Sequence, residues 1–491
     1  PPFAESVNAG VKTVMVNSGE VNGVPLHTCK FYLTDVLKGE LNFDGFVVSD
    51  WMDIQYLHDR HKVAATQKEA VALAVNAGVD MSMVPQDYTF FNYLIELVKE
   101  GKVSEERIDD AVKRILKVKL QSGLFEKPVT DYRDYPKFAS REFSSFNLHA
   151  AEEAITLLKN TNDHLPIKKT DKVLITGPTA NAMTALNGGW SFNWQGTETD
   201  EFIEANNTIL EAIQEEIGKS NVVYVPGSGF EKEIDIDKAV RAAGGVDHII
   251  LCLGEDAYCE KPGDINDLYL PEAQQMLAES LAKTGKPVTL VLVEGRPRVI
   301  SKFEKEMDAV LMAYLPGNRG GDAISNILFG DVNPSGKLPF TYPRYPNSLE
   351  TYDHKHTENL DDGETSFNPQ YEFGHGLSYT TFQYSNLKLS DTVMTDNKNV
   401  NVTIEVKNTG KRKGKEAILL FVSDHYASIT PSVKQLKKFK KISLDAGETK
   451  VVGFSINKKD LAFVGNDNKW ITEPGMFTIY VGNQKAQVRM N

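Results

Sequence analysis

Asp44-Gly-Phe-Val-Val-Ser-Asp50-Trp51 places an acidic residue and an indole directly after a short run of apolar residues. An apolar run of this length, bounded by glycine and polar residues, is typical of a buried parallel strand. Residues 11–16 and 79–84 have the same character, and residues 31–41 and 67–76 have helical periodicity. This alternation predicts a βα-barrel scaffold, in which side chains at the carboxyl ends of the strands face the active-site mouth.

Asp50 therefore has two interpretations. It is a candidate for catalysis because it follows a buried strand on a scaffold of this kind. Alternatively, it caps the helix that comes next, and Trp51 packs in the core. The local pattern leaves both interpretations open.

The first region contains only part of such a barrel. Residues 90–120 form a long helical stretch that is broken at Gly101, and Ser104 is a good N-cap for its second half. About three βα units fit before residue 127, whereas a closed barrel needs eight strands. Residues 1–127 are therefore predicted to be the C-terminal part of a (β/α)8-type barrel, whose other half lies on the same or another chain.

Three further regions follow. Residues 128–144 are polar and contain proline, which predicts a linker. Strand-like runs separated by helical stretches predict an open α/β sheet domain over 145–345, and a polar connecting loop covers 346–382. Short alternating strands predict a small β-sandwich over 383–491. The predicted fold class is thus a multidomain α/β protein. The strands expected in the last two domains are 173–176, 222–225, 248–253, 288–293, 309–314, 400–407, 417–422, 450–456 and 476–481.

Composition excludes several functions. The chain has 491 residues, 41% of them hydrophobic, a formal net charge of −13 and no apolar run of the roughly 18 residues that a membrane span needs. The acidic balance argues against nucleic acid as a partner. Three cysteines without a CxxC pair indicate neither a zinc site nor a disulfide framework, and we expect no metal or cofactor. Because the chain opens Pro-Pro-Phe without a targeting signal, we expect the natural N-terminus to precede it.

An aromatic segment, Asn187-Gly-Gly-Trp190-Ser-Phe-Asn-Trp194-Gln-Gly196, is too short and irregular for a helix or strand. Sugar rings present apolar C–H faces that stack on indoles, so Trp190 and Trp194 are candidates for carbohydrate contacts. Packing of either indole in the core is the alternative.

The segment 253–264 is rich in carboxylates and follows another predicted strand, and Pro262 and Gly263 make it a loop. A solvated acidic loop is the usual explanation. Its position just beyond a strand end nevertheless makes Glu255 and Glu260 functional candidates.

These segments together resemble glycoside hydrolase family 3, the plant exo-β-glucanase type most closely. Gly45–Trp51 is similar to the family's nucleophile signature, 77–85 to the strand after it, 188–196 to its aromatic loop, and Glu255, Tyr258, Glu260, Gly263 and Asp264 to its acid/base loop. Further matching segments are 315–317, 320–323, 328–331, 334–339 and 373–382.

The resemblance implies a retaining, exo-acting β-glucosidase that removes terminal β-linked glucose from oligosaccharides or glucans. Asp50 would be the nucleophile and Glu260, on a different domain, the acid/base, with Glu255 in reserve. The residues implied to bind substrate are Trp51, Trp194, Met15 and Met83. It also implies that the β-sandwich is fibronectin type III-like, and we expect a periplasmic or secreted protein that can form a homodimer.

The chain departs from the family pattern in two places. Ser18 stands where many relatives have tyrosine, and Met52 stands where the plant type has an acidic residue. The family's Asp, Arg and Lys-His sugar ligands belong to barrel strands that the chain does not include. β-Xylosidase or phosphorylase activity in the same family and a catalytically dead carbohydrate-binding or scaffold protein are the competing interpretations. N-acetylglucosaminidase fits less well, because that branch takes its acid/base histidine from the barrel.

Overall fold

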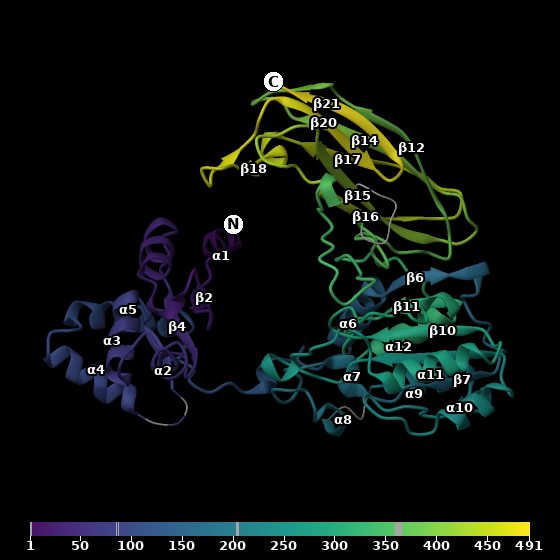
Figure 1. Ribbon diagram of the computed structural model, residues 1–491, viewed down its shortest axis with the longest axis horizontal. Helices are drawn as coiled ribbons and strands as arrows, with labels where there is room; N and C mark the ends of the chain where they lie inside the picture. Colours follow the sequence, from purple (N-terminus) through teal and green to yellow (C-terminus); the bar gives the residue numbers. More distant parts are fainter. Residues whose placement is uncertain (1, 85, 87, 203–205, 359–365) are drawn as a thin grey trace. The chain divides into compact units, whose positions relative to one another are not determined.

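The computed structural model describes residues 2–84, 86, 88–202, 206–358 and 366–491. The chain divides into two compact units, which we call the N-terminal unit (residues 1–138) and the C-terminal unit (residues 139–491) (Figure 1). Pro85, the last residue of the motif 77–85, lies outside the described residues, as does the segment 359–365 of the predicted connecting loop.

The N-terminal unit contains a parallel three-stranded sheet in the order β1-β4-β5. All three strands were predicted, and they are β1 (Thr13–Met15), β4 (Phe46–Trp51) and β5 (Met81–Met83). The strands are close-packed where β4 begins, since a Cβ on Gly45 would lie 2.1 Å from the Lys12 carbonyl oxygen. Glycine is therefore the residue that this approach requires.

Helices connect the strands, as the alternating pattern predicts. The chain passes through a helix of π-type turns (Phe31–Glu40) between β1 and β4, and through α2 (Asp53–Asp59) and α3 (Gln67–Ala77) between β4 and β5. The long helical stretch is divided into α4 (Thr89–Lys99) and α5 (Glu105–Gln121), and the Ser104 hydroxyl accepts a hydrogen bond from the Arg107 N–H at 3.2 Å. This N-cap was predicted, and it is confirmed.

A buried ion-pair network ties these elements together. The Asp80 carboxylate has no solvent-exposed side-chain surface and accepts from Lys38 Nζ at 2.8 Å and from the Val47 N–H at 2.8 Å. Arg107 of α5 also contacts it. Because Val47 belongs to β4, the network fixes the strand that carries Asp50.

A helix begins inside the predicted linker. α6 spans Arg141–Ala154, and the Ser140 hydroxyl caps it by accepting from the Phe143 N–H at 3.2 Å. A hydroxyl side chain before a helical run is the usual signal for such a start, so residues 141–144 belong to the helix and not to the linker.

The C-terminal unit begins with a six-stranded sheet in the order β6-β11-β10-β9-β7-β8. Its members are β6 (Thr156–Asn160), β7 (Val173–Thr176), β8 (Val222–Tyr224), β9 (His248–Gly254), β10 (Val288–Val293) and β11 (Ala309–Met312). Five of them are parallel and were predicted, whereas β6 was missed and pairs antiparallel to β11. Alternate side chains of each strand enter two apolar clusters, one on each face.

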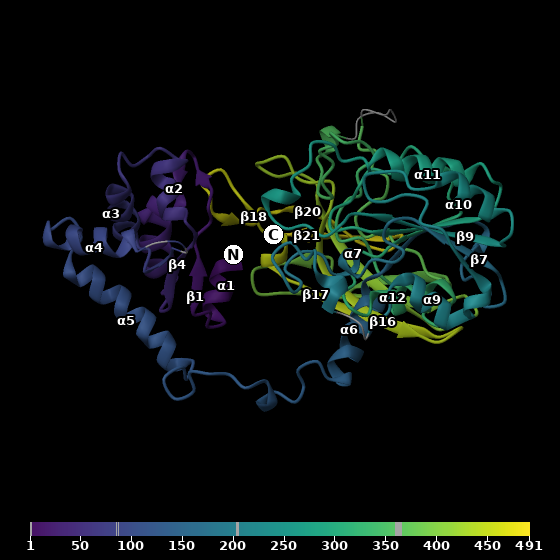
Figure 2. The same cartoon turned by 90° about the horizontal axis from the view of Figure 1, so that it is seen from below.

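Helices cover both faces of this sheet, as Figure 2 shows. On one face α12 (Gly320–Leu328) contacts both α6 and α9 (Ile209–Ile217), and α10 (Ile236–Ala243) and α11 (Glu272–Ala282) lie on the other face. The strand order reverses at β7, which has β8 on one side and β9 on the other. In open α/β sheets, ligands bind beyond the carboxyl ends of the strands at such a switch point.

The last domain is a β-sandwich with sheets ordered β12-β14-β17 and β13-β21-β20-β15-β16. Its strands are β12 (Phe382–Leu389), β13 (Val393–Met394), β14 (Val400–Asn408), β15 (Gly414–Asp424), β16 (Gln435–Leu444), β17 (Thr449–Ile456), β20 (Gly475–Val481) and β21 (Gln484–Met490). The Glu153 carboxylate of α6 forms ion pairs with Lys415 of β15 and Lys441 of β16. The sandwich therefore contacts the α/β domain through α6.

The predicted fold class is confirmed. Parallel βα units, an open α/β sheet covered on both faces and a β-sandwich follow one another in the predicted order. Among the described residues, no helix combines the length and apolar character that a membrane crossing requires.

Candidate active site

Asp50 lies at the carboxyl end of the central strand of the N-terminal sheet. The register between β4 and β5 shifts between Val48 and Trp51, so Asp50 occupies an irregular stretch of the ladder. The buried Ser49 hydroxyl stabilises this stretch, because it donates to the Asp50 carbonyl oxygen at 2.9 Å and accepts from the Met83 N–H at 2.8 Å. Irregularities of this kind redirect side chains next to active sites.

The other predicted site residues of this unit lie at the same sheet edge. Met15 ends β1, Met83 ends β5 and Trp51 follows Asp50 at the end of β4. Met15 is 53% exposed and Trp51 56%. An exposed indole beside a half-buried carboxylate offers an apolar face and an anionic oxygen together, which suits a sugar ring.

The helix-cap interpretation of Asp50 is wrong. The N-cap of α2 is Met52, whose backbone is left-handed at φ 62°, and no side chain caps this helix. Instead, Asp50 Oδ1 accepts from the N–H of Trp51 at 2.6 Å. The helix therefore begins at a left-handed residue two positions after Asp50, without a hydrogen bond from the Asp50 side chain.

A second carboxyl group, Asp53, begins α2 shortly after this strand end. It is buried and accepts a hydrogen bond from the Ser18 hydroxyl at 2.6 Å, and its Oδ2 lies 3.6 Å from His27 Nε2. Burial raises the pKa of Asp53, and the neighbouring Asp50 raises it further. Burial lowers the pKa of His27 to about 4, and His61 adds to that effect, so His27 is neutral at physiological pH.

The aromatic loop of the C-terminal unit follows β7 and the short helix α7 (Met183–Asn187). It is closed by a hydrogen bond of 2.9 Å from the Trp190 N–H to the Trp194 carbonyl oxygen. Trp190 is 70% exposed and Trp194 46%. Both indoles therefore present surface to solvent, and their packing in the core is not supported.

The loop of residues 255–264, which we call the acid loop, follows β9, the neighbour of β7 in the sheet. Glu260 is exposed, and its backbone has φ 54° and ψ −146°. A residue other than glycine pays on the order of 1–3 kcal/mol in such a conformation, and strain of this kind concentrates at functional sites. The 3-10 turn Lys261–Gly263 follows, in which the Gly263 N–H donates to the Glu260 carbonyl oxygen at 2.9 Å.

Gln195 joins the two loops. Its side-chain Oε1 accepts from the Cys259 N–H at 3.0 Å, and its Nε2 donates to the Cys259 carbonyl oxygen at 3.1 Å. Each such bond contributes about 0.5–1.5 kcal/mol, so the pair is similar in size to the backbone strain at Glu260. Sequence analysis missed Gln195, because its partner lies 64 residues away and no local pattern identifies it.

The thiol of Cys259 lies among the candidate groups. Its pKa is raised by desolvation and then by the Glu260 carboxyl, whereas the indoles of Trp190 and Trp194 act in the opposite direction. Glu260 and both tryptophans thus each act on one side chain, and the two loops meet through Gln195 at the switch point of the sheet.

Glu255, the reserve candidate, has a different environment. It is buried, and its Oε1 accepts from Arg296 Nε and from Arg298 Nη1, each at 2.8 Å. Hydrogen bonds of this kind between a guanidinium group and a carboxylate are stronger than those between neutral groups, so Glu255 is held firmly in place. The Arg296 guanidinium also lies 4.1 Å from the ring centroid of Tyr258. Sequence analysis did not identify either arginine.

The predicted site residues therefore form two groups. Asp50, Trp51, Met15 and Met83 share one sheet edge in the N-terminal unit, and Glu260 and Trp194 share the switch point in the C-terminal unit. Within the described residues, no cluster of three or more histidine, cysteine or acidic side chains is arranged to hold a metal ion.

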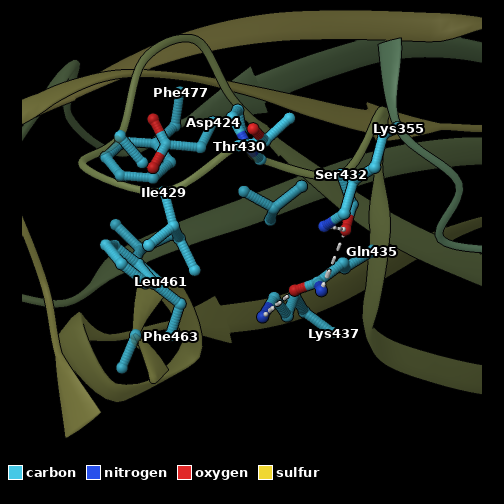
Figure 3. A pocket seen from close by; sticks show the side chains of 14 residues that line it. Lys355, Asp424, Ile429, Thr430, Ser432, Gln435, Lys437, Leu461, Phe463 and Phe477 are labelled. Carbon is cyan, nitrogen blue, oxygen red and sulfur yellow. Dashed lines mark hydrogen bonds between the residues drawn. The ribbon is translucent and has the colours of Figure 1, made fainter. Parts of the chain in front are cut away.

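A separate cavity of about 90 Å³ lies in the β-sandwich (Figure 3). Ile429, Leu461, Phe463 and Phe477 line one part of it, and Lys437 donates to Gln435 Oε1 at 3.0 Å in another. Pockets that enclose small molecules usually measure about 300–1,000 Å³. This cavity is too small for that role, and none of the predicted site residues lines it.

Comparison with known proteins assigns all three regions. Residues 1–118 match the N-terminal domain model of glycosyl hydrolase family 3, residues 155–379 its C-terminal domain model, and residues 416–485 the fibronectin type III-like domain model. The chain belongs to glycosyl hydrolase family 3. The predicted family membership is confirmed.

Named family members align over nearly the whole chain. It is 42% identical to a lysosomal β-glucosidase of Dictyostelium discoideum over 99% of its own length, and 35% identical to a β-xylosidase of Formosa agariphila over 98%. It covers 61% and 69% of these relatives, respectively. The chain thus spans about three fifths of the length of the first.

A solved β-glucosidase has the same fold. The β-glucosidase of Listeria innocua in complex with gluconolactone superposes with a TM-score of 0.91 at 29% sequence identity. The match covers 100% of this chain and 69% of that one.

Proposed function

We propose that the protein is a retaining, exo-acting β-glucosidase with Asp50 as its nucleophile and Glu260 as its acid/base. One observation carries the proposal: in a family 3 chain, Asp50 lies at the carboxyl end of the central strand of a parallel sheet, next to the exposed Trp51. That position is where barrel enzymes carry catalytic side chains.

The mechanism assigns one step to each carboxyl group. Asp50 attacks the anomeric carbon while Glu260 protonates the glycosidic oxygen, so the aglycone leaves as an alcohol and a glycosyl-enzyme ester forms. Glu260 then takes a proton from water, the water oxygen attacks the anomeric carbon, and Asp50 is released. Retaining enzymes need the two carboxyl groups about 5–5.5 Å apart in the working enzyme.

Three features support Glu260 over Glu255 as the acid/base. Glu260 is exposed and therefore accessible to a sugar, and it acts on the same Cys259 thiol as the exposed Trp194. Glu255 is buried and bound by two arginines. Its accepting oxygen is already engaged by two guanidinium groups, and its side chain offers little surface to a sugar.

Substitution of each residue in the full-length enzyme tests the assignment. Asp50→Ala should reduce kcat/KM on the order of 10⁴-fold or more, because no glycosyl-enzyme can form. Glu260→Ala should slow substrates with poor leaving groups by about 10²–10⁴-fold and activated aryl glucosides far less. Asp256→Ala, which removes an exposed carboxylate of the same loop, is the control.

Azide distinguishes the two roles further. With Glu260→Ala, azide should attack the glycosyl-enzyme and yield a β-glucosyl azide, whereas Asp50→Ala should give no product of retained configuration. Near wild-type activity of Asp50→Ala would refute the nucleophile assignment. If Glu255→Ala shows the leaving-group pattern and Glu260→Ala does not, the two roles are exchanged.

β-Xylosidase activity is the second candidate, because the chain is also similar to a protein of that name. A pocket for glucose must accommodate a hydroxymethyl group that xylose lacks. Parallel measurement of kcat/KM on 4-nitrophenyl β-glucoside and β-xyloside decides between them. We expect the glucoside to be preferred, and a preference for the xyloside would assign the protein to the second class.

We further propose that the barrel is completed by residues beyond these 491, on the same or another chain. β1 and β5 each have one neighbour in the described sheet, and family relatives are longer than this chain. The 491 residues alone should then be inactive. If the isolated chain hydrolyses β-glucosides, this part of the proposal fails.

A further inference from the structure

We propose that Gln195 is a positioning residue that holds Glu260 in place and couples it to Trp194. This inference rests on the proposed role of Glu260 as acid/base. Gln195 is adjacent to Trp194 in sequence, and its amide binds the backbone of Cys259, which precedes Glu260.

The contact is specific to a primary amide. One atom of the side chain must accept from the Cys259 N–H, at 3.0 Å, and another must donate to the Cys259 carbonyl oxygen, at 3.1 Å. Asparagine and glutamine carry both functions at neutral pH. A shorter side chain would not reach both groups from the same backbone position.

The contact restrains the backbone where restraint is needed. Glu260 has φ 54° and is followed by the turn Lys261–Gly263, whose hydrogen bond holds the Glu260 carbonyl group. Gln195 binds both the N–H and the carbonyl group of Cys259, the residue before Glu260. Without Gln195, the peptide between Cys259 and Glu260 could rotate toward an unstrained conformation and move the carboxyl group.

Close packing makes the two loops move together. A Cβ on Gly189 would lie 2.5 Å from the Tyr258 carbonyl oxygen, and one on Gly196 would lie 3.2 Å from the Cβ of Ala257. The aromatic loop therefore contacts the acid loop on both sides of Gln195. A sugar stacked on Trp194 would share a rigid frame with the proton donor, so that binding of the leaving group and its protonation are linked.

Kinetics of full-length variants test the functional part. Gln195→Met keeps the side-chain length and removes both hydrogen bonds. We expect kcat/KM for cellobiose to fall roughly 10–100-fold and that for 2,4-dinitrophenyl β-glucoside to change less than about 3-fold, since only the poor leaving group needs protonation. Equal losses on the two substrates, or no loss on either, would overturn the proposal.

Gln195→Glu adds a pH-dependent readout. An ionised carboxylate accepts from the Cys259 N–H but repels its carbonyl oxygen, whereas a protonated one can donate to it. The cellobiose activity of this variant, relative to wild type, should therefore recover as pH falls toward about 4. If the ratio of variant to wild-type activity does not depend on pH, the proposal that Gln195 makes both hydrogen bonds to Cys259 is contradicted.

Alkylation of Cys259 tests the contact without relying on activity. When Gln195 is replaced by methionine, iodoacetamide should modify Cys259 several-fold faster, because thiol reactivity follows exposure. The buried Cys252 in the same peptide digest is the internal reference. Unchanged labelling of Cys259 would show that Gln195 does not hold the loop.

The matched control is Asn193→Ala. Asn193 also makes two side-chain hydrogen bonds, at 3.2 and 3.1 Å, but both go to Thr197, the residue after the aromatic loop, and none to the acid loop. Its removal should change neither Cys259 labelling nor the dependence on the leaving group. If Gln195→Met alters labelling while Glu260→Ala shows no leaving-group effect, the contact is real and the acid/base assignment is wrong.

Discussion

The exposed side chains of Trp194 and Glu260 are held by backbone contacts and not by burial. Trp194 is 46% exposed, and the loop that carries it is closed by its own hydrogen bonds and by Gln195. Such a side chain is available to a ligand without a rearrangement of the core. The contribution of either side chain to substrate binding or turnover should therefore be measurable by substitution without unfolding the domain.

We predict that Trp194→Ala lowers kcat/KM for a disaccharide more than kcat/KM for an aryl glucoside. Stacking acts on the sugar beyond the cleaved bond, and an aromatic contact is worth about 1 kcal/mol, so kcat/KM for cellobiose should fall roughly 5–10-fold. Hydrolysis of 4-nitrophenyl β-glucoside should change little. Equal losses would mean that Trp194 supports the fold of the loop and does not bind substrate.

The backbone of Glu260 gives a second prediction. Glu260→Gly and Glu260→Ala both remove the carboxyl group, but only glycine adopts φ 54° without strain. The free energy of unfolding of the glycine variant should be about 1 kcal/mol higher than that of the alanine variant. Urea unfolding, followed by a signal from the C-terminal unit, measures this difference. Equal stability would indicate that the turn relaxes when the side chain is lost.

Sequence predicts some of these residues better than others. Asp50, Trp194 and Glu260 were predicted as site residues because each lies next to a recognisable strand end or loop signal, and their roles stay predictions. Gln195 and Arg298 were not found, since their partners are far away in the sequence and an ordinary polar residue carries no local mark. The helix-cap interpretation of Asp50 failed because the left-handed backbone at Met52 is not visible in the pattern.

At the end of β10, the central sheet carries an acidic residue that the proposed mechanism does not use. Glu294 is fully buried, and its Oε1 accepts from the Tyr342 hydroxyl at 2.9 Å and from the Arg298 N–H at 3.2 Å. Burial raises the pKa of Glu294 to about 8. The native protein therefore keeps this side chain protonated in neutral solution.

We predict that Glu294 makes stability depend on pH. Below about pH 4.5 the carboxyl group is protonated in both states, so its contribution to native stability is fully present. As pH rises toward about 8, only the unfolded state releases the proton, so native stability falls, by roughly 3–5 kcal/mol in all. Glu294→Gln should flatten this slope in urea unfolding between pH 5 and 8, with the exposed Glu279→Gln as control. An unchanged slope would exclude Glu294 as its source.

Strands that are continuous apolar runs were predictable, whereas β6 and β16, which both lie at sheet edges, were missed. β9 and β10 are continuous apolar runs, which identify them directly. β6 lies at the sheet edge and ends in polar residues, and β16 carries lysines along an exposed edge of the sandwich. Edge strands use such polar residues to avoid pairing with other chains, and this composition hides them from a search for apolar runs.

Each of the two units has its own core, which has consequences for how the chain unfolds. The apolar cluster of the N-terminal unit contains no residue beyond Ile108, and the three clusters of the C-terminal unit begin at residue 148. Separate cores are the condition for separate domains. The segment between them, 122–140, contains one short 3-10 turn, Tyr132–Asp134.

We predict that limited proteolysis of the isolated 491 residues cuts first within residues 1–141. The described sheet of the N-terminal unit has only three strands, and its helix α5 exposes Val112, Leu116 and Leu120, so this unit opens more readily than the rest. Mass spectrometry should recover a stable fragment that begins near residue 140. If cuts appear first in the α/β sheet or the sandwich, the predicted difference in stability is wrong.

The periplasmic or secreted location stays a prediction.

The left-handed backbone at position 260 affects how the protein could be engineered. A library of the whole enzyme screened only for survival of heating would enrich glycine at this position. Every enriched variant would have lost the proposed proton donor. Selection for heat resistance and selection for turnover thus act in opposite directions at this residue, and the former should be applied to helix caps and surface charges, with residue 260 held fixed.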